Sequence, residues 1–145
     1  MVSDQMKQVM LKFYDAFNQG DFAALDEILD DNFIEHEPLP PRLAQDREGM
    51  KHYLKMFRKA FPDLKFTVQD IAADGDKVWT RVMARGTQRE DFVGIPATGK
   101  PIQMKVVDIC RIKQNKMVEH WGVMDQLAMM QQMGAVLSTA ELDLA

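Results

Sequence analysis

The sequence contains a single cysteine, Cys110, among its 145 residues, so one chain cannot form an internal disulfide. No apolar run approaches the ~18 residues of a membrane span, and Asp4 stands where a secretory signal would be basic. Lys and Arg gather in no long stretch, and the net charge is −4. We therefore expect neither nucleic acid nor a membrane as a partner, and we predict a cytoplasmic location.

Several catalytic motifs are also missing from the sequence. It has no GxSxG, no CxxC, no phosphate-binding glycine loop and no dinucleotide fingerprint. These absences argue against hydrolase, redox and nucleotide chemistry.

The composition is that of one globular domain, with 46% hydrophobic and 28% charged residues. We place the domain at residues 1–134 and treat 135–145 as a C-terminal tail, because the tail has no clear apolar period. Twelve methionines stand at spaced positions. They either fill the core or form a pliable apolar cavity for a bulky ligand.

The apolar pattern predicts helices first and strands afterwards. Caps and apolar stripes indicate helices at residues 3–19, 21–28, 46–61 and 125–133, and a brief extended segment at 32–37. After Pro62 the period changes to two, which predicts strands at residues 65–73, 77–89, 100–113 and 116–124. This order is typical of an α+β fold in which a strongly curved antiparallel sheet surrounds a cavity and N-terminal helices cover its concave face.

The strand at residues 100–113 has one more apolar face, and Asp108 lies on it. Its pairing with the next strand depends on the turn between them. A two-residue turn would pair Asp108 with Trp121, whereas a three-residue turn with Asn115 at positive φ would pair Asp108 with Gly122. We prefer the three-residue turn, which points Val118, His120 and Gly122 inward.

Asp108 and His120 each have two interpretations. Asp108 is either a hydrogen-bonded structural carboxylate or an acid that burial keeps protonated, ready to donate near neutral pH. His120 is either a core histidine or an acid–base group. The segment NFIEHEPLPP adds His36 or Glu37 at the cavity mouth, and which of Glu35, His36 and Glu37 faces inward stays open. His36, His120 and Asp108 lack tight spacing for a metal site, so we expect no metal.

The chain resembles the SnoaL-like polyketide cyclases, within the nuclear transport factor 2-like or ketosteroid isomerase-like superfamily. The segments that carry the resemblance are FNQGDFAALDEILDDNFIEHEP, REGMKHYLKMFRKAFPDLKFTVQDIAADGDKVWTRVMARGT, FVGIPATGK and RIKQNKMVEHWGVMDQLAMMQQMG. The resemblance implies a cone-shaped α+β barrel with a deep apolar pocket, commonly dimeric through the sheet.

The resemblance also implies which residues act. The cyclases carry an acid two residues after the histidine that matches His120, and that position is Gly122 here. Asp108 matches the protonated aspartate of the steroid isomerase. The isomerase's tyrosine falls at Phe13, and its base falls near His36 or Glu37.

We therefore predict a cofactor-independent cyclase, isomerase or dehydratase that acts on a small, apolar carbonyl compound. Asp108 would hold or protonate the oxyanion, His120 would shuttle protons, and His36 is a second acid–base candidate. The alternatives are a non-catalytic small-molecule binding protein and a fold relative whose polar residues are structural. A homodimer would form through the outer sheet face. The predicted pocket-lining residues are Trp79, Gln88, Met104, Val106, Cys110, Gly122, Phe13 and Phe57.

Overall fold

A computed structural model describes residues 2–136. These residues form four helices and five strands: α1 (Val2–Gln19), α2 (Leu25–Ile28), β1 (Leu29–Glu35), α3 (Arg47–Ala60), β2 (Lys65–Asp74), β3 (Lys77–Thr87), β4 (Pro101–Lys113), β5 (Lys116–Met124) and α4 (Gln126–Gln132). The α+β order predicted from the sequence is confirmed. Of the predicted tail at 135–145, residues 137–145 lie outside the described part of the chain.

Local signals in the sequence place the helix ends. Gly20 follows α1 at a φ of 72°, a conformation that glycine adopts without a Cβ penalty. Asp46 caps α3, because its carboxylate accepts a 2.9 Å hydrogen bond from the Gly49 amide. Asp125 caps α4 in the same way through the amide of Ala128. These are the caps that the sequence predicted.

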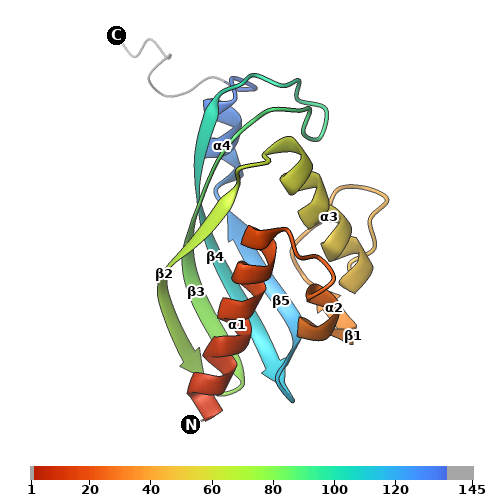
Figure 1. Ribbon diagram of the computed structural model, residues 1–145, viewed down its shortest axis with the longest axis vertical. Helices are drawn as coiled ribbons and strands as arrows, with labels where there is room; N and C mark the ends of the chain where they lie inside the picture. The colour runs from red at the N-terminus through yellow and green to blue at the C-terminus, as the bar shows by residue number, and fades with distance from the viewer. Residues whose placement is uncertain (1, 137–145) are drawn as a thin grey trace.

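The five strands form one open sheet in the order β1-β5-β4-β3-β2. Four strands are antiparallel neighbours, but β1 pairs with β5 in parallel. The sheet is therefore mixed, which corrects the prediction of an antiparallel sheet. Figure 1 shows α1 and α3 on the same side of the curved sheet, as expected for helices that cover a concave face. The core lies between these helices and the sheet.

The β4–β5 register matches the prediction, but the turn that produces it does not. Lys113 pairs with Lys116, so the turn has two residues, and both Gln114 and Asn115 have positive φ. A register shift after Arg111 then leaves Val118 as an extra residue in β5, a β-bulge.

The bulge restores the side-chain parity that the three-residue turn would have given. Asp108 pairs with Gly122, and Cys110 pairs with His120. His120 is 4% exposed, as predicted. Val118 was predicted to point inward, but Met117 takes that place and is 1% exposed.

The outer face of the sheet is partly apolar and open to solvent. Trp79, Val107 and Val123 are 44%, 42% and 72% exposed. Within the described residues, none of the helices has both the length and the apolar character to cross a membrane.

Candidate active site

A cavity of about 50 Å³ lies between the helices and the concave side of the sheet. Most of the residues that line it are apolar, and four of these residues are methionines: Met10, Met50, Met117 and Met124. The volume holds only a few water molecules, since one water needs about 10–15 Å³ on this measure. A larger ligand can enter only if walls move, and methionine is the apolar side chain best suited to that movement.

The structure brings part of the predicted site to this cavity. Asp108 and His120 line it, together with Phe13, Phe57, Val106 and Cys110. Burial raises the pKa of the Cys110 thiol well above its usual value, so this cysteine stays protonated and is no nucleophile.

Four predicted lining residues do not line the cavity, and one of them is Gly122, which lies behind the side chains of Glu37 and His120. Trp79 points to the outer face, because Val78 and Thr80 on either side of it take the inward positions of β3. Met104 is buried in the core but does not reach the cavity wall. Gln88 is fully buried, and its amide binds Ile95 and Thr98, so it fastens the loop at residues 91–99.

His36 also lies outside the cavity, which corrects its prediction as an acid–base group. Its side chain is 38% exposed, its Nε2 lies 2.7 Å from Glu119, and its ring stacks on Trp121 at 4.7 Å. The alternation of side chains along β1 and its extension explains this placement. Glu35 and Glu37 point inward, so the residue between them must point outward.

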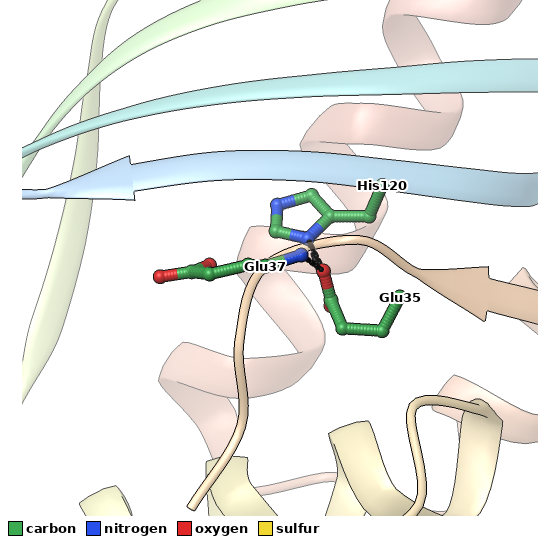
Figure 2. Close-up of side chains that lie close together, drawn as sticks. All are labelled: Glu35, Glu37 and His120. Carbon is green, nitrogen blue, oxygen red and sulfur yellow. Dashed lines mark hydrogen bonds and ion pairs between the residues drawn. The ribbon is translucent and has the colours of Figure 1, made fainter.

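His120 lies between two carboxylates in the wall of the cavity. Its Nδ1 is 2.7 and 2.8 Å from the two oxygens of Glu35, and its Nε2 is 2.8 Å from Asp108. Glu35 is also bound by the backbone amide of Glu37 at 2.9 Å. Figure 2 shows Glu35 beneath the His120 ring and the Glu37 side chain extending away from it.

Asp108 uses its second oxygen to bind Tyr14, which donates from α1 at 2.6 Å. The Tyr14 hydroxyl also lies 2.7 Å from the hydroxyl of Thr80. Burial, and then the charge of Asp108, raises the pKa of Tyr14 well above its usual value, so Tyr14 remains a donor. Both oxygens of Asp108 are thus occupied, which leaves it poorly placed to hold a substrate oxygen.

The two carboxylates keep His120 protonated. Burial lowers the pKa of His120, but hydrogen bonds and charge from Asp108 and Glu35 outweigh this effect and raise the pKa to about 10. An imidazolium that holds its proton at neutral pH is a poor proton shuttle. Its contribution is a fixed positive charge beside the cavity.

The raised pKa of His120 predicts a fall in stability at alkaline pH. The folded protein keeps a proton that the unfolded chain releases above about pH 6.5, so this stabilisation is complete below pH 6.5 and is lost as pH rises through 10. We expect the melting temperature, followed by circular dichroism, to fall between pH 7 and 10.

Two variants serve as comparisons for this fall. Glu35→Gln removes one partner of His120 and should flatten the slope, whereas His36→Gln, on the outer face, should leave it unchanged. A wild-type melting temperature that stays constant from pH 7 to 10 would contradict the raised pKa of His120 in the folded protein.

Glu37 is a carboxylate on the cavity wall without a hydrogen bond from its own side chain to any of residues 2–136. Burial raises its pKa to about 7; the charge of His120 opposes this shift, and Asp108 and Glu35 add to it. Near neutral pH the group is therefore divided between its acid and its base form, which suits proton transfer.

Gly122 provides the space that Glu37 occupies. A Cβ on Gly122 would lie 2.5 Å from Oε2 of Glu37, and 2.7 Å from Cε1 of His120. The Glu37 carboxylate thus stands where a side chain at position 122 would begin. The resemblance to the polyketide cyclases places their acid at position 122, and here Glu37 brings a carboxylate close to that position from the segment that follows β1.

Sequence reasoning missed Tyr14 and did not choose Glu37. Tyr14 directly follows Phe13, where the resemblance placed the isomerase tyrosine, and a shift of one residue would have found a donor. For Glu37, the signal was the alternation of side chains along an extended segment. Phe33, Glu35 and Glu37 are two residues apart, so all three point to the side on which the apolar Phe33 enters the core.

His36, His120 and Asp108, which the sequence analysis set aside as a metal site, do not come together, because His36 is on the outer face. Glu35, Glu37 and His120 do offer ligand atoms within 4.8 Å of one another. However, the separation of 2.7 Å between His120 and Glu35 is that of a hydrogen bond, and a metal on Nδ1 would have to displace it. The geometry fits an ion pair.

The comparisons with known proteins agree with this fold. The sequence model of the SnoaL-like polyketide cyclase family matches residues 7–133, and the chain belongs to that family. No protein of curated function matches the chain.

Three solved structures illustrate the likeness. TsrD from Streptomyces laurentii has a TM-score of 0.83 and 30% identity, over 92% of this chain and 97% of TsrD. IdmH from Streptomyces antibioticus, a candidate polyketide cyclase, has a TM-score of 0.79 and 35% identity, over 90% of this chain and 99% of IdmH. AclR from Streptomyces galilaeus, a candidate hydroxylase, has a TM-score of 0.82 over 94% of this chain and 85% of AclR, but its 23% identity shows the fold alone.

Proposed function

We propose that this protein is a cofactor-independent enzyme that transfers protons on an enolisable, largely apolar carbonyl compound, as a cyclase, isomerase or dehydratase. Glu37 is its base. The observation that carries the proposal is a carboxylate in a largely apolar cavity wall whose side chain has no hydrogen-bond partner among residues 2–136, and burial raises its pKa to about 7. A cytoplasmic location remains part of the proposal.

The reaction needs only one base that later acts as an acid. Ionised Glu37 takes a proton from the carbon beside the carbonyl group; the C–H bond breaks, an O–H bond forms, and the electron pair moves into an enolate. In an isomerisation Glu37 returns the proton to another carbon. In a ring closure the enolate carbon attacks a second carbonyl, and Glu37 protonates the new alkoxide. The substrate is neither oxidised nor reduced.

The buried ion pairs tune Glu37 for this role. Glu35 and Asp108 carry negative charge beside it, and the His120 imidazolium carries positive charge. The positive charge opposes the rise in the pKa of Glu37 that burial causes, and it keeps part of the group ionised at neutral pH. His120, Asp108 and Glu35 therefore act as positioning and charge-setting residues.

Deuterium exchange at the α-carbon of small ketones and esters, followed by NMR, tests the proposal. We expect exchange of at least some of them, acetophenone included, above the rate in buffer. Saturable binding of such compounds with no exchange would favour the alternative, a non-catalytic binding protein. The replacement of the cyclases' acid by Gly122 is the observation that keeps this alternative in view.

We also propose a homodimer through the outer sheet face. Val107 and Val123 are direct cross-strand neighbours there, and a second copy would cover both and Trp79. We expect light scattering at micromolar concentration to give the mass of two chains. Val107→Lys should yield a monomer, whereas Leu127→Lys, at an exposed site on α4, should not. A monomeric wild type would contradict this proposal.

A further inference from the structure

We propose that the hydroxyl of Tyr53 is the hydrogen-bond donor that binds the substrate's carbonyl oxygen. This inference deepens the proposed function and rests on it for the identity of the substrate. It names a residue in α3 that the sequence did not single out, and it replaces Asp108 in the role of oxygen holder.

Tyr53 is buried in the cavity wall, with only 7% of its surface exposed. Its ring is fixed by Phe57, with ring centres 4.8 Å apart, and by Phe92 at 6.5 Å. Its hydroxyl has no hydrogen-bond partner in the part of the chain that the structure describes. Among the described residues, the one fully buried side-chain atom without a partner is Nε of Arg58, so the hydroxyl oxygen of Tyr53 keeps some accessible surface. A ligand in the cavity can therefore accept its proton, with the modest net gain of an ordinary hydrogen bond.

The other strong donors at the cavity wall are already engaged. Tyr14 donates to Asp108 at 2.6 Å, and His120 binds carboxylates through both ring nitrogens. Cys110 offers only a weak S–H donor. Among the described lining side chains, Tyr53 is therefore the neutral donor that remains for a ligand.

Tyr53 also lies near the proposed base. Burial, and then the negative charge of Glu37, raises the pKa of Tyr53, so its hydroxyl keeps its proton. The contribution from Glu37 means that the carboxylate is close enough to interact electrostatically with the Tyr53 hydroxyl. A donor for the oxygen and a base for the neighbouring C–H are the two groups that enolisation requires.

This pair defines the class of substrate. The ligand presents one carbonyl oxygen to Tyr53 and an adjacent acidic C–H to Glu37, and its remainder is uncharged and apolar to match the aromatic and methionine walls. A substrate with a carboxylate beside the carbonyl is disfavoured, because Glu37 and Asp108 line the cavity and Glu35 lies next to it against His120. The single positive charge of His120 does not balance a further carboxylate there.

The test compares acetophenone with α-methylstyrene, which has a CH₂ group in place of the carbonyl oxygen. Both are titrated by protein NMR into the wild type, Tyr53→Phe and the control Tyr14→Phe, which loses a hydroxyl already bonded to Asp108. We expect Tyr53→Phe to reduce the preference for the ketone by roughly 3- to 10-fold. Tyr14→Phe should leave that ratio unchanged. The infrared carbonyl band of bound ¹³C-labelled acetophenone should move to higher frequency in Tyr53→Phe alone.

The outcomes separate this inference from the proposed function. An unchanged ketone preference in Tyr53→Phe, a loss of preference in Tyr14→Phe instead, or no saturable binding of acetophenone would overturn the role of Tyr53. A Tyr53-dependent preference without α-proton exchange would uphold the binding role and overturn the proposed catalysis. Exchange that proceeds equally fast in Tyr53→Phe would uphold the catalysis and overturn the role of Tyr53.

Discussion

Glu37→Gln is expected to lower the rate of α-proton exchange by roughly 10²- to 10⁴-fold, the usual contribution of a positioned acid–base group. Glutamine keeps the shape of the side chain but cannot take a proton. It also removes the one carboxylate in the cavity wall that has no bonded partner among residues 2–136. The measurement is the NMR exchange rate under saturating ketone.

The pH dependence of the rate gives this prediction a second readout. As a base, Glu37 works only when ionised, so the wild-type rate should rise with pH through about 7 and level off above it. In Glu37→Gln the rise should disappear. Glu90→Gln makes the same chemical change at a half-exposed site and should leave both the rate and its profile unchanged.

A Glu37→Gln variant that exchanges as fast as the wild type would show that another group is the base. A pH profile that rises through about 4 to 5, where an unperturbed glutamate titrates, would show that burial does not tune Glu37 as described.

Gly122→Asp is expected to lower both stability and exchange, although it restores the acid that the polyketide cyclases carry. The new Cβ would lie 2.5 Å from the Glu37 carboxylate and 2.7 Å from the His120 ring. Glu37 can swing aside, but His120 is held at both nitrogens. Overpacking of this kind costs about 1–3 kcal/mol, and a fourth carboxylate in the cluster adds repulsion.

The double variant Glu37→Ala/Gly122→Asp tests directly whether a carboxylate at position 122 can replace the carboxylate of Glu37. Removal of the Glu37 carboxylate clears the space and the excess charge, so an aspartate at 122 should restore part of the exchange that Glu37→Ala alone abolishes. The two substitutions should thus be strongly non-additive. Gly122→Ala carries the steric effect without the charge, and thermal melting of all four variants separates the two.

Additive effects of the two substitutions would contradict the idea that Glu37 occupies the place of the missing acid. So would a Gly122→Asp variant that retains full stability with Glu37 present.

The register of β4 and β5 shows how far a local pattern can predict a site. The apolar face of β4 correctly placed Asp108 inward, because burial follows side-chain alternation. The pairing with β5 was also correct, but for the wrong reason: a two-residue turn and a bulge at Val118 replace the predicted three-residue turn. Both routes shift the strand by one residue, and the sequence does not distinguish them.

The residues around His36 show where the sequence reached its limit. It identified an acidic segment before Pro38, yet it favoured the histidine, which faces outward onto Trp121. The choice depends on the pairing of β1 with β5, where Glu35 meets His120 across 85 positions of the chain. No local period specifies a partner at that distance.

The sequence by itself determined the α+β order, the N-caps of α3 and α4, the inward face of β4 and the family, because apolar periods, capping residues and motif spacing are local properties. Only the tertiary structure decided which polar residues form the site. It bonded Asp108 to Tyr14 and placed His120 between two carboxylates. It also left the side chains of Glu37 and Tyr53 without a hydrogen-bond partner among the described residues. These outcomes depend on how α1, α3 and β1 pack around one cavity, and burial in that cavity sets the pKa values on which the chemistry rests.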